Sequence, residues 1–178
     1  MLKLHLGCGP HIKPGWENLD LQPGNGGKQA DLTKPLPYLK DSVSYIFSEH
    51  FIEHISREQG VKMLKECFRV LKPGGVLRIS TPNLEVLVLD YLDNKLTRWG
   101  SVWLPNTRAQ LINEGMRSWG HQFLYDIEEL TLVLEEAGFQ QVNIVSYMKS
   151  NDNALSDQEV RPYHEDIIME AKKHGSHQ

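Results

Sequence analysis

The sequence has few cysteines and no spacing that would link them. Two of its 178 residues are cysteine, Cys8 in a glycine turn and Cys67 in a stretch with helical periodicity. Thiols placed in this way give neither a disulfide framework nor the paired spacing of a structural zinc site. The composition therefore excludes a disulfide-rich secreted fold, and we expect a cytoplasmic protein.

Long apolar runs and strong net charge are also missing. The first apolar stretch stops at Gly7, which is too short for the core of a signal peptide, and no later run has the length of a transmembrane helix. The 19 lysine and arginine residues stand against 23 aspartate and glutamate residues, and the net charge is -4. We therefore expect no membrane partner and no nucleic-acid partner, and the sequence predicts no particular oligomeric state.

The sequence does contain an alternation of short apolar strands and amphipathic helices. Helices are expected from Ser56, which forms a capping-box pattern with Gln59, to the "KPGG" stop, and from Asp126 to Gly138. Strands are expected at residues 2–6, 16–21, 43–48, 76–80, 141–147 and 167–171. This alternation indicates a single α/β domain, residues 1–178, with an open, largely parallel sheet and helices on both faces.

The middle of the chain has a less regular pattern. A short helix carrying Val86 and Leu87 is expected, with Asn83 or Asn94 at its boundary. Residues 99–120 are aromatic and are punctuated by glycine and proline. We interpret residues 84–122 as an irregular insertion or lid.

A Gly-x-Gly turn follows the first expected strand, and an aspartate ends the second. Glycine at Gly7 and Gly9 removes Cβ atoms, so backbone N–H groups can approach a ligand, and Asp20 can accept hydrogen bonds from both hydroxyls of a ribose. An ordinary tight turn and a solvated aspartate fit the same residues. A nicotinamide-binding fingerprint is disfavoured, because it needs a glycine where Ile12 stands and an acidic residue further on than Asp20.

The turn belongs to a set of motifs that extends over nearly the whole chain. In order, these are "LHLGCGP", "NLDL", "ADLTKPLP", "VSYIFSEHFIEHI", "ECFRVLKPGGVLRISTPN" and "HQFLYDIEELTLVLEEAGF". With this set, the sequence resembles the class I S-adenosylmethionine-dependent methyltransferases of the small, Methyltransf_11-like type. The most characteristic piece is "RVLKPGG" before a strand.

The resemblance implies a fold, a cofactor and a set of binding residues. The fold is a Rossmann-like, seven-stranded, mostly parallel sheet of order 3-2-1-4-5-7-6 with strand 7 antiparallel, and the cofactor is S-adenosylmethionine. The implied cofactor-binding residues are Gly7, Cys8 and Gly9 at the methionine part, Asp20 and Leu21 at the ribose, Asp31 and Leu32 at the adenine, and Ser48 and Glu49 after the fourth strand.

The chain departs from the family pattern near the cofactor. His5 stands where the family usually has an acidic residue, and His11 stands where it has a third glycine. The region between strands 1 and 2 is shortened and hardly holds the usual helix. A non-catalytic cofactor-binding or interaction module therefore stays open as an alternative.

Three histidines are the candidate catalytic residues. In "SEHFIEHI", His50, Glu53 and His54 have the spacing of one helical face. Histidine acts as a base near neutral pH, and a neighbouring carboxylate raises its pKa and orients it. We predict that His50, His54 and His121 are catalytic, as acid-base or acceptor-positioning groups, and we assign no metal.

Two alternatives to this role stay open. In the first, Glu53 and His54 are ordinary polar residues of a helix surface. In the second, the group holds a divalent metal with His121, as a related arrangement does in some RNA 2′-O-methyltransferases, which have an E-x-x-E-H pattern where this chain has H-x-x-E-H.

Aromatic and basic residues alternate in the middle segment. They suit an acceptor pocket that stacks a ring and pairs an anion, and they equally suit the small core of an ordered loop. They are Trp99, Trp103 and Trp119, with Arg98, Arg108 and Arg117.

From these features we predict an S-adenosylmethionine-dependent methyltransferase that acts on an oxygen or nitrogen atom of a small-molecule or glycan-like acceptor. Transfer from a sulfonium is an in-line displacement, so much of the rate can come from holding the acceptor against the methyl carbon. The alternatives are the non-catalytic module and a metal-dependent RNA methyltransferase.

Overall fold

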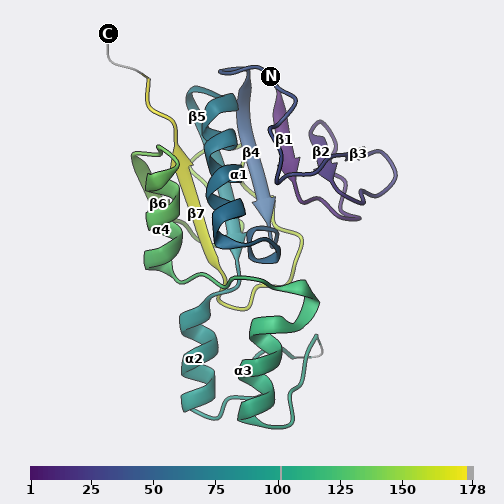
Figure 1. Cartoon of the computed structure of the whole chain (residues 1–178), viewed down its shortest axis with the longest axis vertical. Coiled ribbons are helices and arrows are strands. Elements are labelled where there is room, and N and C mark those ends of the chain that lie inside the picture. Colours follow the sequence, from purple (N-terminus) through teal and green to yellow (C-terminus); the bar gives the residue numbers. More distant parts are fainter. Residues whose placement is uncertain (101, 176–178) are drawn as a thin grey trace.

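The computed structural model describes residues 1–100 and 102–175. This part of the chain is built around one seven-stranded β-sheet (Figure 1). Its strands are β1 (Lys3–Leu6), β2 (Glu17–Asp20), β3 (Lys28–Gln29), β4 (Val43–Glu49), β5 (Leu71–Thr81), β6 (Gln141–Ile144) and β7 (Ile167–Lys172). Their order is β3-β2-β1-β4-β5-β7-β6, and β7 is antiparallel to both β5 and β6. The predicted strand order and the antiparallel last strand are confirmed. The short β3 is not among the strands expected from the residue pattern, although the seven-stranded order that the resemblance implies includes it.

The parallel strands bring the predicted site residues to one edge of the sheet. Leu4 of β1 lies beside Ile46 of β4, and Leu6 lies beside Ser48. All four side chains are fully buried, which is why this region reads as continuous apolar strands. Because β1, β2, β4 and β5 are parallel, their carboxyl ends meet at the same edge. The glycine turn after β1 and the segment after β4 therefore lie close together.

Two capped helices, α1 (Arg57–Val70) and α4 (Ile127–Glu136), cover one face of the sheet (Figure 1). The Ser56 side chain accepts from the backbone of Gln59 and the Gln59 side chain accepts in return, as the capping-box pattern predicts. The Asp126 side chain accepts from the backbone N–H of Glu129 at the start of α4. Both predicted helix starts are confirmed.

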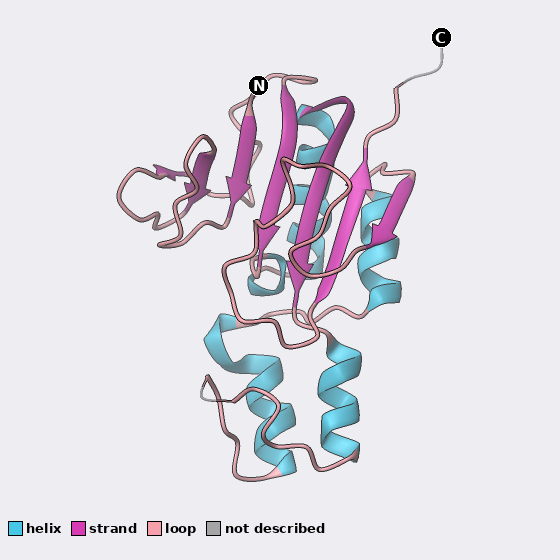
Figure 2. Cartoon of the chain, turned by 180° about the vertical axis from the view of Figure 1, so that it is seen from behind, coloured by secondary structure: helices cyan, strands magenta, loops and turns pink. Residues whose placement is uncertain are grey.

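The opposite face carries a loop in place of helices, so the expectation of helices on both faces holds for one face only. Residues 145–166, here called the strap, cross this face between β6 and β7 (Figure 2). Arg78 of β5 points into the strap and is fully buried. Its Nε lies 2.6 Å from Oε1 of Glu159, and its Nη1 lies 2.7 Å from Oε1 of Glu170. The strap is fixed there because a buried guanidinium requires charged partners.

The connection between β1 and β2 contains no helix, as the shortened segment predicts. The side chain of Asn18 organises this connection instead. Its Oδ1 accepts from the backbone N–H of Lys13, and its Nδ2 donates to the carbonyl groups of Lys13 and Trp16. One buried amide thus satisfies backbone groups that a helix would have paired internally.

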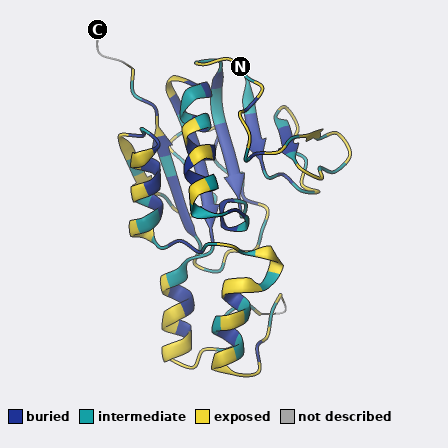
Figure 3. Cartoon of the chain, viewed as in Figure 1, coloured by how far each residue is buried: buried dark blue, intermediate teal, exposed yellow. Residues whose placement is uncertain are grey.

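The insertion is a pair of helices, and the expectation of an irregular segment over residues 99–120 was wrong for α3. The pair consists of α2 (Leu84–Leu92) and α3 (Arg108–Arg117), and α3 begins at the capping side chain of Thr107. The two helices pack through Gly115, where a Cβ would lie 2.7 Å from Leu87 Cδ1. They lie beyond the carboxyl edge of the sheet, with their outer sides exposed (Figures 1 and 3). Residue 101 of the expected lid is outside the described residues, and the lid role stays a prediction.

Across the described ranges 1–100 and 102–175, each helix is too short or too polar to cross a membrane.

Candidate functional site

The glycine turn after β1 has backbone conformations that favour glycine. Gly7 has a φ of +69° and Gly9 has a φ of +49°, both in the left-handed region. A Cβ at Gly7 would lie 2.5 Å from the Cβ of Phe51, whereas a Cβ at Gly9 would meet no atom within 4 Å. Gly7 is therefore required by the packing of Phe51. Gly9 leaves open space beside the turn, and the small side chain of Cys8 is buried.

Asp20, the last residue of β2, faces this turn. Its Oδ2 accepts from the backbone N–H of Gly9 at 2.9 Å, and its Oδ1 accepts from the backbone N–H of Gln22 at 2.8 Å. Each carboxylate oxygen keeps a second acceptor position. The next residue, Leu21, is exposed. The structure thus brings Gly9 and Asp20 together, and the Asp20 carboxylate keeps acceptor positions for a ligand.

Asp31 and Leu32 follow β3 and behave differently from each other. Oδ1 of Asp31 accepts from the hydroxyl of Thr33 at 2.6 Å and from its backbone N–H at 2.9 Å. These hydrogen bonds, led by the hydroxyl, lower the pKa of Asp31. Leu32 is buried in the core. Asp31 is the accessible member of this pair.

Ser48 and Glu49 end β4, and Glu49 holds the strap. The Glu49 carboxylate accepts from the backbone N–H groups of Val160 and Arg161, each at 3.1 Å. The buried hydroxyl of Ser48 has no hydrogen-bond partner within the described part of the chain. The expected role of Ser48 and Glu49 in cofactor binding stays a prediction.

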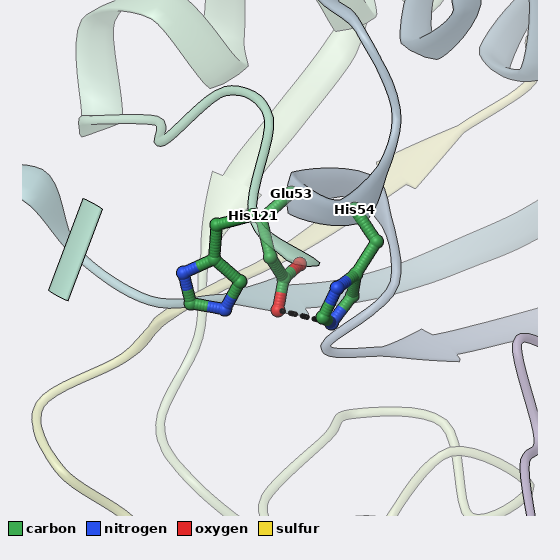
Figure 4. A group of neighbouring side chains, drawn as sticks. All are labelled: Glu53, His54 and His121. Atoms are coloured by element: carbon green, nitrogen blue, oxygen red, sulfur yellow. Dashed lines mark ion pairs between the residues drawn. The ribbon is translucent and has the colours of Figure 1, made fainter. Parts of the chain in front are cut away.

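Beyond β4, three predicted residues converge. Glu53 and His54 lie in the short 3-10 helix η1 (Ile52–His54), and His121 follows the short 3-10 helix η2 (Ser118–Gly120). One ligand atom from each residue lies within 4.8 Å of the others. Figure 4 shows the three side chains gathered at one point, with Nε2 of His54 3.9 Å from Oε1 of Glu53. The grouping of Glu53 with His54 and His121 is thus present in the structure.

His50 lies beside this group, between two carboxylates. Its Nδ1 is 3.4 Å from Oε1 of Glu53, and its Nε2 is 3.4 Å from Oδ2 of Asp166 in the strap. Burial by itself lowers the pKa of His50, but the carboxylates of Asp166 and Glu53 outweigh it and raise the pKa to about 9. His50 is therefore an imidazolium at neutral pH. The same contact opposes the effect of burial on Glu53 and lowers the pKa of Glu53.

His121 has the opposite protonation state. Burial lowers the pKa of His121, which keeps the ring neutral at pH 7. Its Nδ1 lies 3.0 Å from the carbonyl oxygen of Gly115. A carbonyl only accepts, so Nδ1 carries the proton and Nε2 keeps a free lone pair.

A cavity of about 310 Å³ adjoins these histidines. The rings of Trp103 and Trp119 meet edge to face at 5.4 Å, and Trp119 lies 5.6 Å from the ring of His121. Trp99 and Trp103 also pack on the apolar cluster around Leu87. Trp99 and Trp103 therefore belong both to a small core and to the cavity wall, whereas Trp119 belongs to the cavity wall. The lining includes His50, Glu53, His54, His121, Trp99, Trp103, Trp119, Arg161 and His164.

The strap contributes residues that sequence reasoning missed. Arg161 and His164 line the cavity, and Asp166 contacts His50. One usable signal in the sequence was Arg78, a charged residue in the middle of a buried strand. Because a buried charge needs a partner, Arg78 indicates that a distant acidic segment must cover the sheet.

Comparisons with known proteins agree with this geometry. Residues 18–79 match the family Methyltransf_11, described as a methyltransferase domain. A protein of Mycolicibacterium smegmatis, described as a probable S-adenosylmethionine-dependent methyltransferase, is 38% identical over 73 residues, which cover 41% of this chain. The match spans a quarter of the length of that relative (25%).

Solved structures share the fold at low identity. A SAM-dependent methyltransferase from Archaeoglobus fulgidus matches with a TM-score of 0.58 and 17% identity, over 96% of this chain and 85% of that one. A possible histamine N-methyltransferase from Thermotoga maritima matches with a TM-score of 0.60 and 19% identity, over 97% and 82%. A phosphoethanolamine N-methyltransferase from Haemonchus contortus matches with a TM-score of 0.64 and 14% identity, over 98% and 49%.

The matched segment and the strand order together confirm what the motifs indicate. The chain resembles the class I S-adenosylmethionine-dependent methyltransferases of the Methyltransf_11 type, and this resemblance implies S-adenosylmethionine as cofactor.

Proposed function

We propose that this chain transfers the methyl group of S-adenosylmethionine to an oxygen or nitrogen atom of a small-molecule or glycan-like acceptor. The observation that carries the proposal is the position of the 310 Å³ cavity. It lies beside the carboxyl edge of the sheet, where the glycine turn and Asp20 would bind the cofactor, and this part of the edge is here called the cofactor edge. His50 lines the cavity and directly follows Glu49, while the next residue, Phe51, packs on Gly7 of the glycine turn. An acceptor in the cavity would thus lie next to a cofactor on the turn.

The cofactor edge fits S-adenosylmethionine at two points. The space beside Gly9, where a Cβ would meet no atom within 4 Å, admits close approach to the backbone. The carboxylate oxygens of Asp20 keep acceptor positions for the ribose hydroxyls. When bound, the cofactor supplies an electrophilic methyl group on a sulfonium. The protein's part is to hold the acceptor in line with that methyl group and to exclude water.

The cavity walls favour a compact, ring-bearing or cationic acceptor. Trp103 and Trp119 offer aromatic faces on which a sugar or aromatic ring can stack. The volume suits a small molecule. The Haemonchus structure of the same fold contains phosphomonomethylethanolamine together with S-adenosylhomocysteine, so the fold accommodates an acceptor of this size.

The three histidines predicted to be catalytic have different roles in the proposed reaction. The free Nε2 lone pair of His121 suits removal of a proton from an acceptor hydroxyl or ammonium group. Both ring N–H groups of the His50 imidazolium face carboxylates, Nδ1 toward Glu53 and Nε2 toward Asp166, so His50 suits holding these two carboxylates beside the acceptor. The ring of His54 lies 5.1 Å from that of His121.

A cytoplasmic location and the lack of nucleic-acid or membrane partners are part of the proposal. Cys8 and Cys67 are both free thiols, as is usual where thiols stay reduced. The net charge of -4 offers no general attraction for phosphate backbones.

Transfer of a labelled methyl group tests the proposal. The purified chain is incubated with methyl-labelled S-adenosylmethionine and, in separate reactions, with amines, phenols, glycosides and short RNA. We expect label in one of the small-molecule classes and none in RNA. Label in RNA alone, or in no acceptor although the cofactor binds, would contradict the proposal.

Variants then locate the acceptor. Trp119→Ala should raise KM for the acceptor, because a stacking wall is lost, while the affinity for S-adenosylmethionine stays unchanged. Leu132→Ala, at an exposed position of α4, is the matched control and should leave both quantities unchanged. Equal kinetics for the Trp119 variant and the wild type would remove the cavity from the acceptor site.

A further inference from the structure

We propose that Glu53, His54 and His121 form a binding site for a divalent first-row transition cation. The carboxylate and the two imidazoles present ligand atoms within 4.8 Å of one another (Figure 4). Ligands of one such ion, at about 2.0–2.2 Å from the metal, lie roughly 3–4 Å apart. The observed separations therefore need only small side-chain rotations to meet this geometry.

Glu53 has an unpartnered oxygen aimed at this point. Its side chain is fully buried, and Oε2 accepts from the hydroxyl of Thr81 at 3.0 Å. Oε1 has no hydrogen-bond partner among the described residues, and its contacts with Nδ1 of His50 and Nε2 of His54 are long, at 3.4 and 3.9 Å. The imidazolium of His50 offsets part of the cost of burying this oxygen, and no hydrogen bond within the described residues offsets the rest. A bound cation would relieve the cost.

His121 is oriented in the way that metal-binding histidines usually are. The hydrogen bond from its Nδ1–H to the carbonyl of Gly115 fixes both the ring and the tautomer. Nε2 is left as the ligand atom. A backbone carbonyl in this position is a common outer partner of metal-ligating histidines, because it raises the basicity of the ring and holds its orientation.

The two segments that carry the ligands are joined without any ion. The backbone N–H groups of Gln122 and Phe123 donate to the carbonyl oxygen of Glu53, at 2.8 and 3.3 Å. The side-chain Nε2 of Gln122 donates to the carbonyl oxygen of His54 at 2.8 Å. The loop after η2 is therefore fixed to η1, and the ligand set is preformed.

The ligand types select the class of cation. Two imidazoles and one carboxylate suit Zn²⁺, Co²⁺, Mn²⁺ or Fe²⁺, whereas Ca²⁺ and Mg²⁺ prefer oxygen ligands only. Three protein ligands leave at least one coordination position open. Because Glu53, His54 and His121 all line the 310 Å³ cavity, that position faces the cavity.

The consequence for the acceptor rests on the proposed function. In the loaded protein the lone pair of His121 would be used by the cation, and a hydroxyl bound at the open position would lose its proton more readily. Cation binding itself does not depend on methyl transfer.

Direct titration tests the site. The untagged full chain is treated with a chelator, dialysed, and titrated with CoCl₂ followed by visible absorption, and with ZnCl₂ followed by calorimetry. We expect one equivalent of each to bind, with Ca²⁺ failing to compete. Glu53→Gln, His54→Ala and His121→Ala should each weaken binding by at least about tenfold, the lower end of what loss of even an outer partner costs. Circular dichroism checks that each variant is folded.

The exposed His11 provides the control, and His11→Ala should bind like the wild type. Failure of the wild type to bind one equivalent, or unchanged binding in all three ligand variants, would overturn the site. S-adenosylmethionine binding and methyl transfer are measured on the same samples. If the wild type binds the cation, the variants do not, and no acceptor is methylated, the result supports the site and counts against the proposed function. Transfer by a chain that binds no cation supports the proposed function and overturns the site.

Discussion

The backbone N–H of Gly9 donates a hydrogen bond to Oδ2 of Asp20, with 2.9 Å between the nitrogen and the oxygen. The glycine turn after β1 and the acidic end of β2 are thereby held to each other. In the absence of a helix after the turn, this bond fixes the place of the carboxylate. The two motifs of the sequence thus form one structural unit.

Replacement of the Asp20 carboxylate should weaken binding of the cofactor. We expect Asp20→Ala to reduce the affinity for S-adenosylmethionine by about 1.5–3 kcal/mol, the scale of hydrogen bonds to a charged group. Calorimetric titration measures the change. Asp93→Ala, at the C-terminal end of α2, is the control and should bind normally. If the two variants bind with equal affinity, Asp20 does not contact the cofactor.

Alanine substitutions at the two glycines of the turn should lower the free energy of unfolding by different amounts. Gly9→Ala should cost about 1–2 kcal/mol of unfolding free energy, because the residue keeps a left-handed conformation. Gly7→Ala should cost about 1–3 kcal/mol more, because its Cβ would meet Cβ of Phe51 at 2.5 Å. Urea unfolding measures both. Equal losses would mean that Phe51 moves away without cost.

The parts of the fold that depend on local chemistry could be predicted from the sequence. The Ser56 capping box marks the start of α1, and Asp126 marks the start of α4. Thr107 also caps a helix, α3. That helix was missed because the surrounding tryptophans, glycines and prolines suggested a loop, and because Gly115 inside it is a poor helix former. Its glycine is explained only by the approach of Leu87, which is a tertiary contact.

The site was predictable where its members share a local motif. The spacing of His50, Glu53 and His54 placed them together, and His121 joined them as expected. Asp166 was not foreseen, because its approach to His50 depends on the path of the strap. Nothing in the local pattern of a polar loop specifies which strand face it covers.

The buried ion pair of Arg78 should contribute strongly to stability. We expect Glu159→Gln to cost about 3 kcal/mol, because the fully buried guanidinium would keep only Glu170 as a charged partner. Glu58→Gln removes an exposed pair with Lys62, so it serves as a control with no measurable change expected. Urea unfolding compares the two variants. Similar stabilities would show that the strap is not held by Arg78.

Stability should depend on pH through His5. Burial of the ring lowers the pKa of His5 from 6.5 to about 4, with a smaller contribution from the Lys13 cation, against the opposing effect of the hydrogen bond that His5 Nδ1 donates to Oδ1 of Asn18. The unfolded chain therefore takes up the proton first as the pH falls. The contribution of neutral His5 to the free energy of unfolding is complete above pH 6.5 and is lost as the pH falls from 6.5 to about 4. The loss is on the order of 2–3 kcal/mol.

The matched variant for this effect is His5→Gln, which keeps a polar partner for Asn18 but does not titrate. Unfolding free energies are measured across the same pH range for both proteins. The difference between wild type and variant should grow with pH up to 6.5 and then stay constant. A difference that does not change with pH would assign the acid sensitivity to other groups.

The position of β7 between β5 and β6 has a consequence for biosynthesis. In the sheet, β6 pairs only with β7, although β6 (Gln141–Ile144) leaves the ribosome before β7 (Ile167–Lys172). β5 must also wait, with one edge unpaired and Arg78 without Glu159 and Glu170. Unpaired edges of this kind recruit other strands. The nascent chain therefore has to keep one side of its sheet open until β7 has been translated, and during this interval its unpaired edges are exposed to aggregation.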